Sequence, residues 1–198
     1  HKVEGVFRMI INIHGYNGKG NNSKFEWLKE HFPAETIISP TLNHGGGITP
    51  SLSKLKYEMF MHGYDRKDGT KKILIATSMG CFAGYILHID YGFDKAIFLN
   101  PCFLPFLHLS GDDRKEFVLK DYVKQFEKNF FDWDEGEDKF INRTVHIVYG
   151  SKDERINHKI ETVPLMPYNF KNWHEVDTFH DIHITGEVEK TVLDILSQ

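Results

Sequence analysis

Short apolar segments alternate along this chain with segments whose apolar residues have helical spacing. The apolar segments occupy residues 9–13, 36–39, 72–76, 95–99, 144–149 and 174–177. Helical patterns cover residues 23–32, 49–63, 79–89 and 187–196, and Ser23 is the predicted N-cap of the first. Strands that alternate with helices form parallel sheets covered on both faces. We therefore predict an α/β fold of three layers, α/β/α, with a mostly parallel central sheet.

The length of 198 residues suits one domain, which we assign to residues 9–198. The chain begins with a histidine, and Met9 opens the first apolar segment, so we interpret residues 1–8 as an expression-tag remnant. Residues 103–142 are too long for a simple crossover and are rich in aromatic side chains. Helical spacing over residues 113–131 indicates an amphipathic helix, and the whole insertion is also compatible with a cap that gives a pocket an apolar wall.

The composition excludes several classes of protein. Hydrophobic residues make up 40% of the chain, which argues against global disorder. The formal net charge of −4 gives no electrostatic reason to expect nucleic acid as a partner. No apolar run reaches the roughly 18 residues that a membrane span needs. Two cysteines cannot form a disulfide framework and no secretion signal is visible, so we expect a cytoplasmic protein. The oligomeric state is not determined by these features.

Chemically active side chains follow several of the predicted strands at their carboxyl ends. Ser78 follows the strand at residues 72–76, Asp153 follows the strand at 144–149, and two histidines follow the last strand. Functional sites of parallel sheets lie at this edge. The order serine, acid, histidine along the chain is the order found in α/β-hydrolases.

Residues 76–80, with the sequence Ala-Thr-Ser-Met-Gly, have the pattern of a nucleophile elbow. The turn requires small residues two positions before and two positions after the serine, because larger side chains would collide with the neighbouring strand or helix. Ala76 stands where glycine is usual, and Gly80 fits the pattern. The alternative interpretation is that Ser78 only caps the helix that follows.

The loop after the first strand has a matching role in the predicted site. A turn at His14 and Gly15 directs the backbone N–H of Tyr16 toward the oxygen of a tetrahedral intermediate, and the N–H of Met79 is the second donor. We interpret the His14 imidazole itself as structural, with hydrogen bonds to backbone groups.

The acid and the base each have a rival nearby in the sequence. Asp153 is favoured as the carboxylate that orients the histidine, and Glu154 is its alternative. His183 is favoured as the base because it lies just before the last helix, and His180 is the alternative. The rejected histidine would then be a pocket or surface residue.

Three other kinds of site do not fit the spacing. Gly15 and Gly20 suggest a phosphate-binding loop, but Asn21 and Asn22 stand where lysine and a hydroxyl residue are required. The pair His174-Glu175 lacks the second histidine of a zinc peptidase. The 12 histidines are scattered, so we expect neither metal nor cofactor. Both cysteines are interpreted as buried small hydrophobic residues.

Taken together, the motifs resemble the small YqiA-type esterases, the UPF0227 family of the α/β-hydrolase superfamily. The resemblance covers nearly the whole chain from Met9. The segments that carry it are residues 13–17 with Ser23-Lys24 after them, residues 77–80, residues 99–101 with Pro105-Phe106, residues 150–154, and His183. It implies a compact α/β-hydrolase fold without the extra N-terminal strands of larger members, and it implies Ser78 as nucleophile, Asp153 as acid and His183 as base. Residues 179–182 depart from the glycine-rich lead-in expected before the histidine.

The sequence therefore predicts a serine hydrolase that cleaves small-molecule carboxylic esters or acyl thioesters through an acyl-enzyme intermediate. The apolar insertion favours an acyl chain over a sugar or a highly charged substrate. Two alternatives remain: a non-catalytic binding module on the same fold, and an acyltransferase that uses the same triad with an acceptor other than water.

Overall fold

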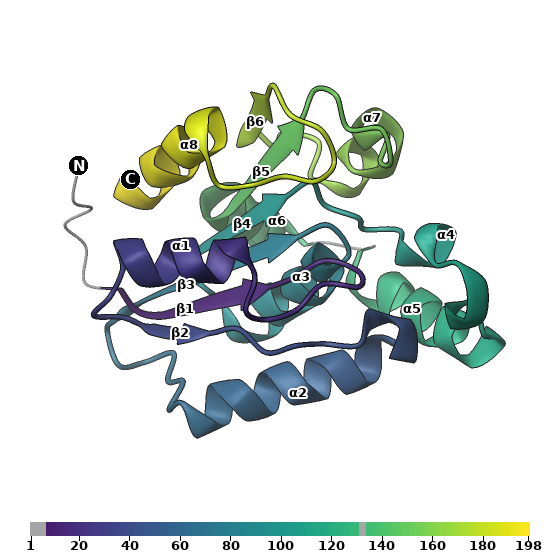
Figure 1. Ribbon diagram of the computed structural model, residues 1–198, viewed down its shortest axis with the longest axis horizontal. Helices are drawn as coiled ribbons and strands as arrows, with labels where there is room; N and C mark the ends of the chain where they lie inside the picture. The colour runs from purple at the N-terminus through teal and green to yellow at the C-terminus, as the bar shows by residue number, and fades with distance from the viewer. Residues whose placement is uncertain (1–6, 131–133) are drawn as a thin grey trace.

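A computed structural model describes residues 7–130 and 134–198 of the chain. Within this part, the centre is a six-stranded sheet with the strand order β2-β1-β3-β4-β5-β6 (Figure 1). All five pairings between neighbouring strands are parallel. The strands are β1 (Phe7–Ile13), β2 (Thr36–Ile38), β3 (Lys71–Thr77), β4 (Lys95–Leu99), β5 (Val145–Gly150) and β6 (Trp173–Val176).

Helices cover both faces of this sheet, which confirms the predicted three-layer α/β/α fold (Figure 1). One face is packed by α1 (Ser23–His31) and α8 (Gly186–Ser197), and the other by α2 (Ile48–Met61), α3 (Gly80–Tyr91), α5 (Glu116–Asn129) and α6 (Glu135–Thr144). Shorter helices are η1 (His44–Gly46), α4 (Pro105–His108), η2 (Gly111–Asp113), α7 (His158–Glu161) and η3 (Val163–Leu165).

The two cores follow from the alternation of side chains along the strands. Successive residues of a strand point to opposite faces of the sheet. In β3, Leu74 and Ala76 therefore face the α3 side, whereas Ile73 and Ile75 face the α1 and α8 side. All of these side chains are fully buried, so the central strands need apolar residues at every position.

The boundaries differ in small ways from those predicted. β1 begins at Phe7, two positions before the predicted start. The first strand therefore includes the last two of residues 1–8, the segment interpreted as a tag remnant. Residues 1–6 lie outside the described chain. The N-cap of α1 is Asn22 rather than Ser23, because the Asn22 carboxamide oxygen accepts hydrogen bonds from the N–H groups of Lys24 and Phe25 at 3.0 Å each.

The insertion between β4 and β5 contributes more to the core than to a pocket. Phe103 and Phe130 are buried and pack with Phe82 and Tyr85 of α3, the Phe130 and Tyr85 rings being 4.4 Å apart. The helix predicted over residues 113–131 is α5, and residues 131–133 lie outside the described chain. The Tyr122 hydroxyl donates a hydrogen bond of 2.8 Å to the carbonyl of His44 and ties α5 to η1.

None of the described helices combines the length and the apolar character required to cross a membrane.

Candidate active site

Ser78 lies at a sharp turn between β3 and α3, with a positive φ of 51°. Non-glycine residues adopt this left-handed region only where the surrounding structure holds them there. Two backbone hydrogen bonds do so: the Ser78 N–H donates to the Leu99 carbonyl at 2.9 Å, and the Ser78 carbonyl accepts from the Cys102 N–H at 3.0 Å. The end of β4 thus fixes the turn that carries the serine.

The small residues predicted around Ser78 are required by close approaches on both sides. A Cβ atom at Gly80 would lie 2.3 Å from the carbonyl oxygen of His14, so no larger residue fits there without a shift of the backbone. Ala76 is accommodated because Gly84 of α3 faces it: a Cβ atom at Gly84 would lie 3.0 Å from the Ala76 methyl group. The Ala76 methyl group therefore fits because Gly84, which lies one helical turn after Gly80, has no side chain.

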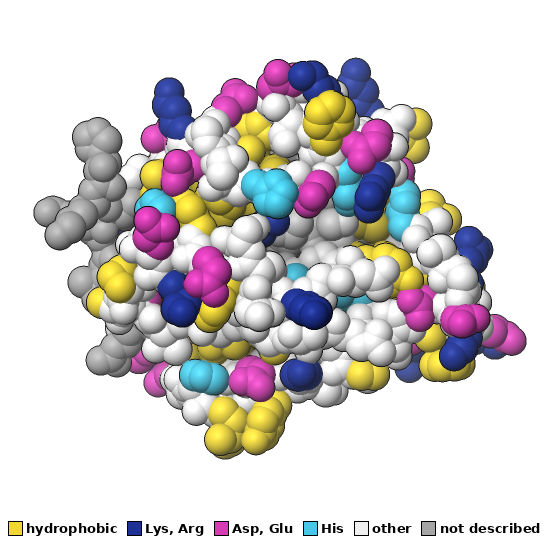
Figure 2. All heavy atoms as spheres, in the orientation of Figure 1, with side chains coloured by type: hydrophobic (Ala, Val, Ile, Leu, Met, Phe, Trp, Pro, Cys, Tyr) yellow, Lys and Arg dark blue, Asp and Glu magenta, His cyan; other side chains and the backbone are white. Residues whose placement is uncertain are grey.

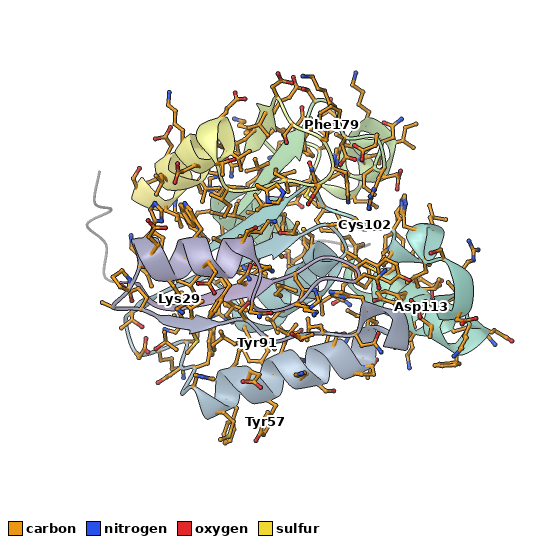
Figure 3. All side chains as sticks on the ribbon, viewed as in Figure 1. Lys29, Tyr57, Tyr91, Cys102, Asp113 and Phe179 are labelled. Carbon is orange, nitrogen blue, oxygen red and sulfur yellow. The ribbon has the colours of Figure 1, made fainter. Side chains whose placement is uncertain are left out.

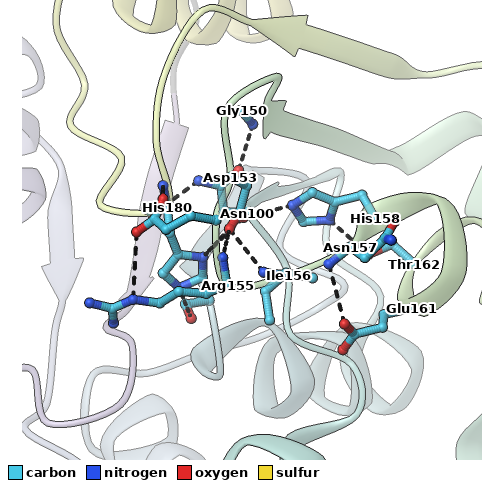
Figure 4. A network of polar contacts seen from close by, with 12 residues as sticks. Asn100, Gly150, Asp153, Arg155, Ile156, Asn157, His158, Glu161, Thr162 and His180 are labelled. Atoms are coloured by element: carbon cyan, nitrogen blue, oxygen red, sulfur yellow. Dashed lines mark hydrogen bonds and ion pairs between the residues drawn. The ribbon is translucent and has the colours of Figure 1, made fainter.

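The histidine that contacts the serine is His180. Its Nε2 lies 2.9 Å from the Ser78 Oγ, and its Nδ1 lies 3.0 Å and 2.9 Å from the two carboxylate oxygens of Asp153. Both partners of the second contact are shielded from solvent, since the side chains of His180 and Asp153 are 9% and 1% exposed. The structure thus brings Ser78, His180 and Asp153 into one hydrogen-bonded chain, seen in part in Figure 4.

His183, which the sequence favoured as the base, lies elsewhere. Its ring is about half exposed, with Nδ1 3.3 Å from the Ser23 Oγ and Nε2 3.4 Å from an Asp181 carboxylate oxygen. The preference came from the position of His183 just before the last helix. The geometry places the alternative, His180, beside Ser78 because the loop after β6 folds back over the end of β5.

Asn100 holds that loop in place. Its side chain is fully buried; its Nδ2 donates to the carbonyls of Phe179 and His180 at 2.9 and 3.0 Å, and its Oδ1 accepts from the Gly150 N–H at 2.6 Å (Figure 4). Gly150 allows the approach, because a Cβ atom there would lie 2.3 Å from the Thr178 carbonyl. The sequence indicated Asn100 only as a strand end, and the local pattern carried no signal of this role.

Asp153 and Glu154 have separate functions in the site. Asp153 Oδ1 accepts hydrogen bonds from the N–H groups of Arg155 and Ile156 at 2.9 and 3.0 Å, whereas Glu154 Oε2 accepts from the backbone N–H of His180 at 3.1 Å and does not contact its ring. Burial by itself raises the pKa of Asp153, but hydrogen bonds from the Ile156 N–H, the His180 ring, the Arg155 N–H and the His158 ring together outweigh it, so the pKa lies below its usual value. Asp153 is therefore a carboxylate that accepts the Nδ1–H of His180.

A second histidine contacts the same carboxylate and was not anticipated from the sequence. His158 of α7 is buried, and its Nε2 lies 2.9 Å from Asp153 Oδ2 while its Nδ1 lies 2.9 Å from the Thr162 Oγ1 (Figure 4). Desolvation lowers the pKa of His158. A neutral ring donates from Nε2 to the carboxylate and accepts the Thr162 hydroxyl proton at Nδ1. His158 thus fixes the orientation of Asp153 without contact to Ser78.

The loop after β1 lies against the serine turn, as a Cβ atom at Gly15 would be 3.2 Å from the Ser78 Cβ. The His14 ring is buried and satisfied by backbone groups: Nδ1 contacts the Gly15 carbonyl at 2.7 Å, and Nε2 accepts from the Leu42 N–H at 2.7 Å. This agrees with the structural role expected for His14. The backbone N–H groups of Tyr16 and Met79 donate to no backbone carbonyl in the described chain.

A cavity of about 400 Å³ opens beside Ser78. Figure 2 shows this face of the molecule hollowed near its centre, with histidine and Lys or Arg side chains around the hollow. Polar and charged groups dominate the lining, which includes Ser23, Lys24, Thr77, Arg155, Asp181 and His183. No described residue of the insertion at 103–142 lines it. Asp113 of the insertion, labelled in Figure 3, accepts a hydrogen bond from the hydroxyl of Tyr16, which lines the cavity.

The two cysteines and the possible metal ligands of the described residues do not form a second reactive site. Cys81 and Cys102 are buried and free, and desolvation raises the pKa of both thiols. Buried, protonated thiols are poor nucleophiles. Across residues 7–130 and 134–198, His, Cys, Asp and Glu side chains form no group of three or more that could hold a metal ion.

Comparison with solved structures identifies the fold. An α/β hydrolase enzyme from the sediment metagenome of the Mar Chica lagoon is 15% identical, with a TM-score of 0.57 over 89% of this chain and 83% of that one. Est1E from Butyrivibrio proteoclasticus is 15% identical, with a TM-score of 0.61 over 96% and 86%. The S-formylglutathione hydrolase FrmB from Staphylococcus aureus is 14% identical, with a TM-score of 0.59 over 98% and 82%.

The chain therefore has the α/β-hydrolase fold. No protein-family model and no curated protein matches the sequence. The likeness to YqiA-type esterases, which the motifs suggested, accordingly stays a prediction, while the wider α/β-hydrolase resemblance agrees with the structural neighbours.

Proposed function

We propose that this protein is a serine hydrolase that cleaves carboxylic esters or acyl thioesters, with Ser78 as nucleophile, His180 as base and Asp153 as the orienting acid. The observation that carries the proposal is the 2.9 Å contact between Ser78 Oγ and His180 Nε2, with Asp153 on the opposite ring nitrogen. A serine that serves only as a helix cap has no need of a buried imidazole and carboxylate in line with its hydroxyl.

The hydrogen-bond directions define the acylation step. The Asp153 carboxylate accepts the Nδ1–H of His180, which leaves Nε2 unprotonated and facing the Ser78 hydroxyl. As Oγ attacks the acyl carbonyl, Nε2 takes the hydroxyl proton and the buried carboxylate stabilises the resulting imidazolium. His180 then returns the proton to the departing alcohol or thiol, and an acyl-Ser78 ester remains.

The N–H groups of Tyr16 and Met79 are the proposed donors to the oxyanion of the tetrahedral intermediate. Met79 directly follows Ser78 in the chain. Tyr16 follows Gly15, which lies against the Ser78 Cβ in the loop after β1. Removal of one such donor typically costs about 3 kcal/mol of transition-state stabilisation. Water activated by His180 then attacks the acyl-enzyme and releases the acid.

A fluorophosphonate probe tests the proposal because it phosphonylates only activated serines. We expect labelling of the native protein and none of Ser78→Ala. His180→Ala should lower both labelling and ester hydrolysis by about a thousandfold or more, as loss of a triad histidine does. His183→Ala is the matched control, since it removes an imidazole three positions away that does not contact Ser78, and its loss should change the rate less than tenfold.

Two outcomes would contradict the proposal. Equal labelling of the native protein and Ser78→Ala would indicate a binding module rather than a hydrolase. A large loss of rate with His183→Ala and none with His180→Ala would restore the assignment that the sequence favoured. Product analysis with added alcohols or thiols distinguishes hydrolysis from acyl transfer to another acceptor.

A further inference from the structure

Lys24 has a charge without a partner in the wall of the cavity beside Ser78. The residue is 7% exposed, yet it is one of the residues that line the cavity. No residue in the described chain accepts a hydrogen bond from its ammonium group or forms an ion pair with it. A buried ammonium normally has a partner, because removal from water without one is costly.

The negative charge of Asp181 acts on Lys24 without a direct ion pair among the described residues. Asp181 attracts it electrostatically, but the Asp181 side chain is 85% exposed and its carboxylate contacts the His183 Nε2 at 3.4 Å. Desolvation is the larger effect and lowers the pKa of Lys24. Because no ion pair in the described part of the chain compensates this desolvation, an anion that enters the cavity would stabilise the ammonium form of Lys24.

Other groups in the same cavity favour an anion as well. Arg155 lines the rim and is two-thirds exposed, with its Nε 3.7 Å from Glu154, a contact too long for a strong pair. Thr77 also lines the cavity, and its hydroxyl is buried without a hydrogen-bond partner among the described residues. The Lys24 ammonium and the outer Arg155 guanidinium are thus the two cationic groups of the cavity wall beside Ser78.

We infer that the cavity binds esters or thioesters bearing a carboxylate or phosphate group, with the anion held by Lys24 and Arg155 while the acyl carbonyl lies at Ser78. This inference rests on the proposed hydrolase function and names its substrate class. It also replaces the expectation that the substrate is not highly charged, which rested on the aromatic insertion, because no described residue of the insertion lines the cavity. A charge-assisted hydrogen bond of this kind corresponds to a preference of about tenfold to a hundredfold.

Matched neutral and anionic esters measure that preference. On the acyl side, mono-4-nitrophenyl adipate is compared with its uncharged amide, the 4-nitrophenyl ester of adipamic acid. On the leaving-group side, 4-carboxyphenyl butyrate is compared with 4-carbamoylphenyl butyrate. We expect kcat/KM to favour the carboxylate by about tenfold or more in at least one pair, and the pair that responds locates the anion relative to the scissile bond.

The variants assign the preference to the cavity. Lys24→Met, which suits a buried position, should bring the anionic-to-neutral ratio close to one. Lys29→Met is the matched control: it removes the same charge from the exposed side of the same helix, where Lys29 lies 4.0 Å from Glu26, and should leave the ratio unchanged. If Lys24→Met does not fold, the exposed Arg155→Met variant should still lower the ratio by about threefold.

A binding measurement separates this inference from the hydrolase proposal. Calorimetric titration of Ser78→Ala with adipate and with adipamide requires no catalysis. Adipate should bind at least tenfold more tightly than adipamide, and the added Lys24→Met change should remove the difference. Absence of any ester hydrolysis with this binding intact would overturn the proposed function alone. A ratio near one in both ester pairs together with equal binding of adipate and adipamide would overturn the inference, as would a preference that persists in Lys24→Met.

Discussion

At the scale of single residues, the candidate site depends on side chains that touch no substrate. Asn100 has the positive φ of 45° and the fully buried side chain of a residue fixed by its surroundings. Its three hydrogen bonds join the ends of β4 and β5 to the loop that carries His180. Asn100 thus positions His180, and in the proposed hydrolase it would act entirely through the place of the imidazole.

We expect Asn100→Gly to lower kcat by about a hundredfold with a smaller change in KM, because a shift of about 1 Å in a catalytic group has effects of that size. Glycine tolerates the positive φ, so the variant removes the side chain without imposing backbone strain. Steady-state kinetics on a neutral ester and urea unfolding measure the two effects separately. Lower stability with an unchanged kcat would show that Asn100 supports the fold only.

At the scale of elements, the tight turn between β3 and α3 forms because two glycines of α3 allow close contact with β1 and β3. Gly80 begins α3 against the carbonyl of His14 at the end of β1, and Gly84 faces Ala76 one turn further along. The sequence predicted the first constraint, since a nucleophile elbow requires a small residue there. It did not predict the second, which depends on how α3 lies across β3.

Gly80→Ala should destabilise the protein by about 1–3 kcal/mol, because the added methyl group overlaps the His14 carbonyl and overpacking has costs of this order. It should also reduce fluorophosphonate labelling, since the serine turn must shift. Gly136→Ala in the first turn of α6 is the control, as its Cβ would meet only the Asp134 side chain at 3.1 Å. That variant should be neutral or more stable by up to about 1 kcal/mol. Equal stability of the Gly80 variant and the native protein, by urea unfolding, would contradict the reasoning.

At the scale of the whole molecule, several histidines are buried in neutral form. Desolvation lowers the pKa of His44 to about 4, that of His88 to about 3 and that of His146 to about 4. His88 lies under α6, where its Nε2 contacts the Thr144 Oγ1 at 2.8 Å. Each of these rings has a higher pKa in the unfolded chain, so the unfolded state binds more protons between pH 6.5 and 4.

The free energy of unfolding should therefore be greatest above about pH 6.5 and fall as the pH decreases toward 4. Each fully buried histidine contributes up to about 1.4 kcal/mol per pH unit in that window. Urea unfolding between pH 7.5 and 4.5 measures the slope. His88→Gln should make the slope shallower, whereas His62→Gln at an exposed position should not. A free energy of unfolding that is constant across the window would contradict the burial of neutral histidines.

The sequence by itself determined the order of strands and helices and the places of Ser78 and Asp153. These depend on local signals: apolar alternation, small residues around a turn, and polar residues at strand ends. The tertiary structure decided which histidine reaches the serine: the local sequence favoured His183, and only the path of the loop over Gly150 and Asn100 brings His180 there instead. It also decided that Lys24 faces the cavity and that the aromatic insertion packs in the core, since both depend on contacts between segments far apart in the chain.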